Sequence, residues 1–177
     1  LFVGRLLRDK GIIEFIEAAK MVIAERDNIE FQILGPADVK NRSALSSSEL
    51  NQMLSDSSIA YLGSKQDVRP YIKEAHCIVL PSYREGLSRV LLEAGSMGRP
   101  VIASDVPGCR DVVVSGHNGF VCQGKSSEDL AEKILLLAAL GHHKISDLGL
   151  NGRQRVKELF SEQVIVSEYM NIIEKVT

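Results

Sequence analysis

The chain has 177 residues, of which 45% are hydrophobic and 25% are charged, a composition typical of one globular domain with a sizeable core. Its formal net charge of -2 excludes the electrostatic footprint of a nucleic-acid-binding protein or of one that binds an anionic membrane surface. With that charge, any phosphate binding must come from local geometry, and no apolar run is long enough to span a bilayer.

Three cysteines, Cys77, Cys109 and Cys122, occur without CxxC spacing. This argues against a disulfide framework or a zinc site and favours a reducing, cytoplasmic location. The chain opens on three apolar residues, with neither an initiator methionine nor a secretory signal. We interpret the opening as the interior of a buried strand and expect the natural protein to extend further toward its N-terminus.

Apolar runs of strand length alternate with helical patterns along the chain, which is typical of a parallel α/β sheet. In chain order, the runs predict strands at residues 1–3, 29–34, 59–62, 76–80, 101–103 and 119–121. Helices are predicted at residues 11–25, 49–55, 68–75, 88–97, 107–114, 127–140, 143–159 and 161–176. The polar, serine-rich residues 37–48 are predicted to form a loop. Asp67 and Ser127 are predicted to cap the helices that follow them.

Six short strands with intervening helices predict a Rossmann-like, doubly wound parallel six-stranded sheet with helices on both faces. Ligands of such sheets bind beyond the carboxyl ends of the strands, near the point where the strand order reverses. The segments that follow the strands are therefore expected to form one rim, at residues 4–10, 35–36, 63–67, 81–88 and 104–108.

The turn after the first strand carries two cations, Arg5 and Lys10, five residues apart. The planar guanidinium of Arg5 and the compact ammonium of Lys10 both suit phosphate oxygens. A surface turn with solvated charges is the alternative interpretation, and this turn alone does not decide between the two.

The segment after the fourth strand places Glu85 and Gly86 just before a helix. Gly86 permits a close backbone approach, and the start of the helix presents free N–H groups that suit an anion. Glu93 lies further along the helix among apolar residues. If it is buried it needs hydrogen-bond donors, for which ribose hydroxyls are suitable; an exposed helix position is the alternative.

Together these motifs resemble the C-terminal, donor-binding domain of retaining glycosyltransferases with the GT-B fold, specifically family four (glycosyl transferases group 1). The resemblance rests on order and spacing over roughly residues 1–140 rather than on any single motif. Its pieces are Gly4-Arg5-Leu6 with Lys10-Gly11, residues 81–86, the pair Glu85 and Glu93, residues 92–104, residues 107–111 and residues 116–120. Residues 81–111 are especially similar to bacterial enzymes that extend lipid-linked or capsular polysaccharide sugars.

The resemblance implies a role for each matching position. The predicted catalytic residues are Arg5 and Lys10, which would hold the donor diphosphate, and Glu85, which would contact hydroxyls of the transferred sugar. The other predicted donor-binding residues are Glu93 at the ribose, Gly63, Ser64 and Lys65 beside the nucleobase, and the backbone amides of Gly86, Leu87 and Ser88. Many relatives carry glycine or proline where Ser88 stands, which puts the geometry of this phosphate loop in question.

The resemblance also implies transfer from a nucleotide-diphospho-sugar with retention, without a metal or other cofactor; our first expectation for the donor is a UDP-sugar. Negative charge grows on the departing diphosphate, where Arg5, Lys10 and the helix start would stabilise it. The sequence contains neither an Asp-x-Asp pair nor a histidine cluster that could bind a metal ion.

The acceptor, a sugar or a lipid-linked sugar, is expected to bind an N-terminal domain absent from this chain. Residues 161–176 are interpreted as the closing helix that crosses back toward that domain. The full-length protein is expected to lie peripherally at the inner face of the membrane, with no nucleic-acid partner.

Two other functions remain open. A non-hydrolysing sugar-nucleotide epimerase shares the GT-B architecture, although the spacing of Glu85 and Glu93 and the Arg5–Lys10 turn favour the transferase. A dinucleotide-binding or regulatory module is disfavoured because the first turn lacks GxGxxG and no acidic cluster follows the strands.

Cys109 falls on the predicted rim, where a reactive thiol is one interpretation.

Overall fold

A computed structural model describes the backbone of residues 1–176 and the side chains through Lys175. Its six strands are short and pair in parallel as two three-stranded sheets, ordered β1-β2-β3 and β4-β5-β6. The strands are β1 (Phe2–Val3), β2 (Gln32–Leu34), β3 (Ala60–Tyr61), β4 (Ile78–Leu80), β5 (Val101–Ser104) and β6 (Gly119–Cys122). The predicted α/β fold is confirmed.

The two sheets meet where β1 lies beside β4. The N–H of Val79 donates to the carbonyl oxygen of Leu1 at 2.9 Å, and the amino group of Leu1 donates to the carbonyl oxygen of Cys77 at 2.9 Å. The order across the molecule is therefore β3-β2-β1-β4-β5-β6, that of a doubly wound sheet. The predicted six-stranded sheet thus forms as two halves, because β1 is only two residues long and its ladder with β4 is limited to these contacts.

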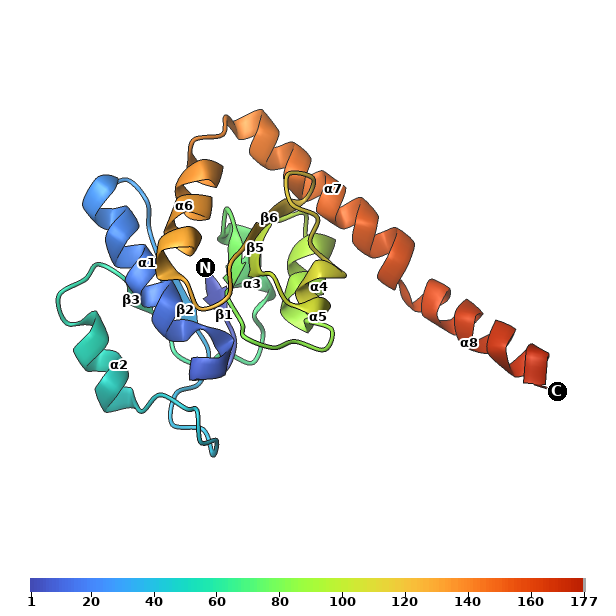
Figure 1. Cartoon of the computed structure of the whole chain (residues 1–177), viewed down its shortest axis with the longest axis horizontal. Helices are drawn as coiled ribbons and strands as arrows, with labels where there is room; N and C mark the ends of the chain where they lie inside the picture. The colour runs from blue at the N-terminus through green and yellow to red at the C-terminus, as the bar shows by residue number, and fades with distance from the viewer. Residues whose placement is uncertain (177) are drawn as a thin grey trace.

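Helices cover both faces of the strands (Figure 1). Helix α1 packs against α6 on one face, and α4 packs against α7 on the other. The helices are α1 (Ile12–Glu25), α2 (Ser47–Leu54), α3 (Arg69–Glu74), α4 (Arg89–Ser96), α5 (Pro107–Arg110), α6 (Ser127–Ala138), α7 (His142–Phe160) and α8 (Glu162–Val176), with a 3-10 turn at Arg8–Lys10.

The apolar face of α1 explains why this helix docks on the sheet. Ile12, Phe15, Ile16 and Ala19 follow helical spacing, and each is at most 1% exposed. The ring of Phe15 lies 5.5 Å from that of Phe2 in β1 and 5.9 Å from that of Phe31 before β2. The start of α1, which directly follows the turn that carries Lys10, is therefore fixed by the core.

Helix caps correct one predicted boundary and one predicted capping residue. Ser46 accepts a hydrogen bond from the N–H of Glu49 in a capping box, so α2 begins two residues earlier than predicted. Ser126, not Ser127, caps α6: its hydroxyl oxygen accepts the N–H of Asp129 at 3.1 Å. Ser127 is instead buried and donates its hydroxyl to Glu17 at 2.5 Å.

The prediction for Asp67 is partly right. The residue directly before α3 is Val68, which makes no side-chain cap. The carboxylate of Asp67 nevertheless accepts the N–H of Arg69 in the first turn of α3, at 3.0 Å, and also pairs with the Arg69 guanidinium.

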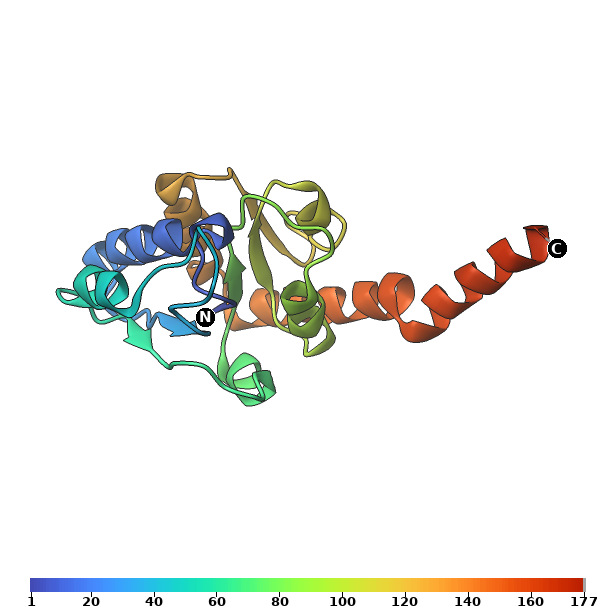
Figure 2. The ribbon, with the colours of Figure 1, turned by 90° about the horizontal axis from the view of Figure 1, so that it is seen from below.

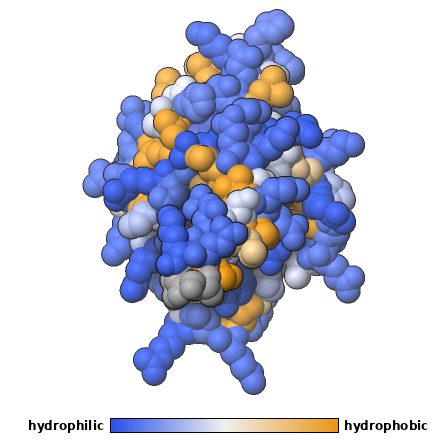
Figure 3. Space-filling model, turned by 90° about the vertical axis from the view of Figure 1, so that its right-hand side faces the viewer, coloured by the Kyte–Doolittle hydropathy of each residue, from blue (hydrophilic) through white to orange (hydrophobic). Residues whose placement is uncertain are grey.

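The last helix, α8, extends away from the body of the molecule (Figures 1 and 2). Seen from that side, apolar patches lie among polar side chains (Figure 3). The exposed large apolar residues of α8 are Ile165, Val166, Tyr169, Met170, Ile172 and Ile173. No helix within the described residues is both long enough and apolar enough to cross a membrane.

Candidate functional site

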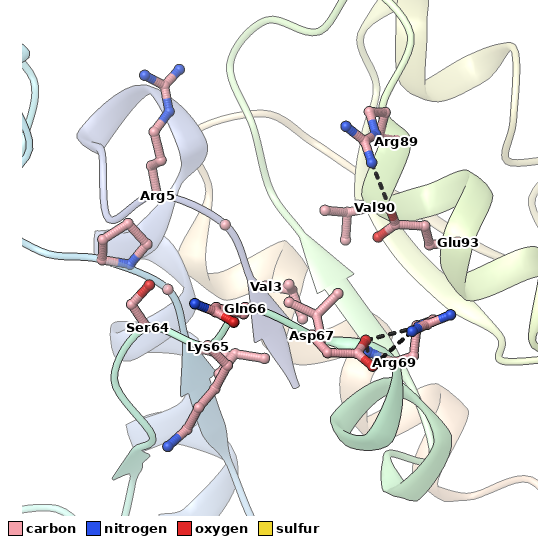
Figure 4. Close-up of a pocket in the computed structure, with 15 residues that line it drawn as sticks. Val3, Arg5, Ser64, Lys65, Gln66, Asp67, Arg69, Arg89, Val90 and Glu93 are labelled. Carbon is pink, nitrogen blue, oxygen red and sulfur yellow. Dashed lines mark hydrogen bonds and ion pairs between the residues drawn. The ribbon is translucent and has the colours of Figure 1, made fainter.

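A pocket of about 630 Å³ lies at the carboxyl ends of β1, β2 and β3 and is closed on its other side by α4 (Figure 4). It is lined by residues from the strand ends and from the first turns of α3 and α4: Val3, Gly4, Arg5, Leu34, Gly35, Pro36, Ser64, Lys65, Gln66, Asp67, Val68, Arg69, Arg89, Val90 and Glu93. The pocket therefore lies on the rim where a doubly wound sheet binds its ligand.

Backbone groups make one side of this pocket. Gly4 donates its N–H to the carbonyl of Leu34, and Gly35 donates its N–H to the carbonyl of Gly63, both at 2.9 Å. At Gly35 a Cβ atom would lie 1.8 Å from the Gly4 carbonyl oxygen, so only glycine permits this approach. Gly63 has a φ of 71°, in the left-handed region that favours glycine. These glycines bring three strand ends together.

Four of the residues predicted from sequence line the pocket: Arg5, Ser64, Lys65 and Glu93. Arg5 is exposed and makes no ion pair or side-chain hydrogen bond within the described residues. In Figure 4 the guanidinium of Arg5 extends away from Glu93, and the ammonium of Lys65 is also directed away from it. The two cations are therefore not engaged by the carboxylate across the pocket.

Glu93 stands on the α4 wall with its carboxylate toward the pocket (Figure 4). Its side chain is 33% exposed, and its Oε1 lies 3.3 Å from the guanidinium of Arg89, one helical turn earlier. The Arg89 side chain is 90% exposed, so this ion pair is weak and readily replaced. The Glu93 carboxylate is thus neither fully solvated nor saturated with donors.

A second cluster gathers around the carboxylate of Glu85. The ammonium of Lys10 donates to Glu85 Oε1 at 2.6 Å, and the hydroxyl of Ser82 donates to the same oxygen at 2.7 Å. Ser82 is fully buried, and the side chain of Glu85 is 9% exposed against 26% for Lys10. The fold therefore brings together the predicted catalytic residues Lys10 and Glu85, whereas Arg5 lines the pocket and bonds to neither of them within the described residues.

Close packing fixes the loop that carries Glu85. Gly11, with a φ of 72°, lies so close to this loop that a Cβ atom there would be 2.0 Å from the Pro81 carbonyl oxygen. On the other side, a Cβ atom on Gly108 would be 1.7 Å from the Gly86 carbonyl oxygen. Sequence reasoning missed this role of Gly108, because nothing local in Pro107-Gly108 reveals which loop lies above it.

The remaining predicted loop residues, Gly86, Leu87 and Ser88, do not line the pocket. Gly86 and Leu87 are exposed, and Ser88 is buried directly before α4 without making a side-chain cap. As at every helix start, the first N–H groups of α4 have no helical partner, and two of the residues that carry them, Arg89 and Val90, line the pocket.

Cys109 does not support the interpretation of a reactive thiol. Its side chain is fully buried in the core, and burial raises the pKa of the thiol to about 12. A neutral, inaccessible thiol is a poor nucleophile, so that interpretation is wrong. Within residues 1–176, no three His, Cys, Asp or Glu side chains gather into a group that could hold a metal ion.

Comparisons with known proteins place this geometry in a family. Residues 1–139 match the model of the family described as glycosyl transferases group 1. Over 168 residues the chain is 30% identical to the capsular polysaccharide biosynthesis glycosyltransferase CapM of Staphylococcus aureus, covering 94% of this chain and 43% of CapM.

A second relative is the N,N'-diacetylbacillosaminyl-diphospho-undecaprenol alpha-1,3-N-acetylgalactosaminyltransferase of Campylobacter jejuni. It is 32% identical over 177 residues, covering 99% of this chain and 44% of that enzyme. Among solved structures, HepE of Anabaena in complex with UDP superposes with a TM-score of 0.82 at 23% identity, over 99% of this chain and 48% of HepE.

The chain thus spans less than half the length of each of these three proteins. Within that span the matches cover at least 94% of this chain, and its parallel α/β fold agrees with the expectation from sequence. The chain therefore belongs to the glycosyl transferases group 1 family and has the fold of a GT-B glycosyltransferase domain.

Proposed function

We propose that this chain is the donor-binding, C-terminal domain of a retaining glycosyltransferase and that it binds a nucleotide-diphospho-sugar, with a UDP-sugar as the first expectation. The whole enzyme would transfer the sugar to a sugar or lipid-linked acceptor held by an N-terminal domain. It would act in the cytoplasm, peripherally at the inner face of the membrane, in the synthesis of bacterial surface polysaccharide or glycolipid.

The observation that carries the proposal is the Lys10–Glu85 ion pair at 2.6 Å on the same rim as the Glu93 pocket. A nucleotide sugar needs a ribose acceptor, a cationic diphosphate site and a carboxylate for sugar hydroxyls. Glu93, the Arg5–Lys10 turn and Glu85 offer these three groups along one edge of the strands.

Names of related proteins support the same class of ligand. HepE has been crystallised with UDP and with UDP-glucose. The related Campylobacter enzyme is named for an undecaprenol-diphosphate-linked acceptor. The HepE complexes support a nucleotide sugar as donor, and the Campylobacter name supports a lipid-linked sugar as one acceptor class.

The chemistry proposed for the rim is electrostatic. As the glycosidic bond to the diphosphate breaks, negative charge grows on the leaving phosphate. Arg5, Lys10 and the N–H groups at the start of α4 would stabilise that charge, each preorganised donor contributing about 3 kcal/mol. Glu85 would orient the transferred sugar through its hydroxyls. We expect the reaction to need no metal ion or other cofactor.

Calorimetry with UDP-, GDP- and ADP-sugars, with and without EDTA, tests the donor-binding function. We expect the UDP-sugars to bind most tightly and their affinity to be unchanged by EDTA. Tight binding of NAD with no binding of any nucleotide sugar would sink the proposal. On the full-length protein, NMR of the product's anomeric proton tests retention, and inversion at another sugar carbon without transfer would identify an epimerase.

A further inference from the structure

Tyr83 occupies a central place in the loop that carries Ser82 and Glu85. Its backbone N–H donates to the carbonyl of Asp9 at 2.8 Å, in the turn that ends at Lys10. Its hydroxyl donates to Glu14 Oε1 in the first turn of α1. One residue thus ties the Glu85 loop both to the Lys10 turn and to the helix behind it.

Glu14 has no function in the donor chemistry proposed above, yet it is 8% exposed. Its Oε2 is buried without a hydrogen-bond partner among the described residues. A carboxylate in such a place is costly, so its single bond to the Tyr83 hydroxyl matters more than a surface contact would. The contact explains this cost if it positions the loop that carries Tyr83 and Glu85.

The phenol ring is also held from the β6–α6 loop. The ammonium of Lys125 lies 5.0 Å from the ring centroid of Tyr83, within range of a cation–π interaction. Lys125 adopts a φ of 63°, an unusual conformation for a residue other than glycine. Burial raises the pKa of the Tyr83 phenol, and the bond to Glu14 raises it further, so the hydroxyl remains a donor.

Building on the proposed donor-binding function, we propose that Tyr83 is a positioning residue. By bonding to Glu14, its hydroxyl holds the Ser82–Glu85 segment against Lys10, so that the Glu85 carboxylate is already placed for the hydroxyls of the transferred sugar. Tyr83 itself need not touch the donor. Preorganisation of this kind lowers the cost of binding the sugar without adding a contact to the nucleotide.

The test combines hydrogen exchange of the 81–88 segment with calorimetry of UDP and UDP-glucose, or of whichever UDP-sugar binds the wild type most tightly. Tyr83→Phe removes only the hydroxyl, and Glu14→Ala removes its acceptor. Both should speed exchange in the segment about tenfold. Both should weaken the UDP-sugar about fivefold or more while leaving UDP affinity within about twofold, because UDP lacks the sugar that Glu85 would meet.

Two variants serve as controls. Glu14→Gln keeps an oxygen acceptor for the phenol and should stay near wild type in both measurements. Tyr169→Phe makes the same chemical change on the exposed surface of α8, where Tyr169 is 66% exposed, and should alter neither measurement.

The possible failures are distinguishable. Unchanged exchange in Tyr83→Phe would overturn the inference whatever the ligands do. Faster exchange with an unchanged ratio of UDP-sugar to UDP affinity would make Tyr83 a structural contact only and would also overturn it. If the wild type binds no UDP-, GDP- or ADP-sugar, the donor-binding function itself is wrong, and the inference falls with it.

Discussion

The ammonium of Lys10 and the carboxylate of Glu85 are hydrogen-bonded at 2.6 Å although 75 positions separate them in the chain. The contact exists because β1 and β4 are neighbours, so the turns that follow these two strands meet at one edge. Gly11 permits the approach, since any side chain there would collide with the Pro81 carbonyl.

Lys10→Ala should weaken UDP binding about 10- to 100-fold and uridine binding little, because a hydrogen bond to a charged group contributes about 1.5–3 kcal/mol. Arg5→Ala should behave in the same way. Calorimetry with UDP and uridine measures both. Arg8→Ala is the control: Arg8 shares the turn, but its guanidinium pairs with Glu49 at 2.8 Å. Equal losses for UDP and uridine in the Lys10 variant would contradict its role at the diphosphate.

Glu93→Ala should weaken the binding of uridine itself, by about tenfold, because the carboxylate would accept hydrogen bonds from ribose hydroxyls. UDP should lose a similar factor. Glu132→Ala, an exposed glutamate on α6, is the matched control and should leave both affinities unchanged. Retention of full uridine affinity without Glu93 would remove the ribose assignment.

Gly108→Ala should destabilise the domain by about 1–3 kcal/mol, since the added methyl group would overlap the Gly86 carbonyl oxygen. Thermal unfolding should show a midpoint roughly 3–10 °C lower. Gly124→Ala is the control, because a Cβ atom there meets nothing within 4 Å. If the Gly108 variant has the same unfolding midpoint as the control variant, the close packing of α5 on the Glu85 loop is wrong.

Stability should fall above about pH 9. Burial raises the pKa of Cys109 and of Cys122 to about 12, from 9.0 in the unfolded chain. The stability that the neutral buried thiols contribute is therefore fully present below pH 9 and is lost as the pH rises toward 12. Each thiol should reduce the free energy of unfolding by about 1.4 kcal/mol per pH unit in that window. Denaturant titrations of the wild type and of a Cys109→Ala, Cys122→Ala double variant measure the difference.

Much of the fold follows from local patterns. The helical pattern at residues 11–25 predicted α1 to within one residue, and all six strands lie within or beside their predicted ranges. Strand lengths were harder to predict. The apolar run at 29–34 forms a ladder only over Gln32–Leu34, because its partners β1 and β3 have two residues each. A strand ends where its neighbour does, and that neighbour is distant in sequence.

The candidate site was predictable as a set of residues but not as a geometry. Arg5, Lys10, Glu85 and Glu93 could be selected from their motifs, and their roles remain predictions. No motif indicated that Lys10 would pair with Glu85 while Arg5 lines the pocket with Glu93. The contacts of Gly108 and Tyr83 were also missed, since both depend on segments brought together only by the tertiary fold.

The pocket straddles the junction of the two three-stranded sheets, with Ser64 on one side and Glu93 on the other. Among the described residues, the backbone hydrogen bonds that join the two strand ladders there are those of Leu1 with Val79 and Cys77. A nucleotide bound across this junction would contact both three-stranded halves and link them. Ligand occupancy would then set how far apart the two walls stand, in addition to its ordinary mass-action effect on unfolding. In such an arrangement the substrate completes the architecture of the domain that holds it.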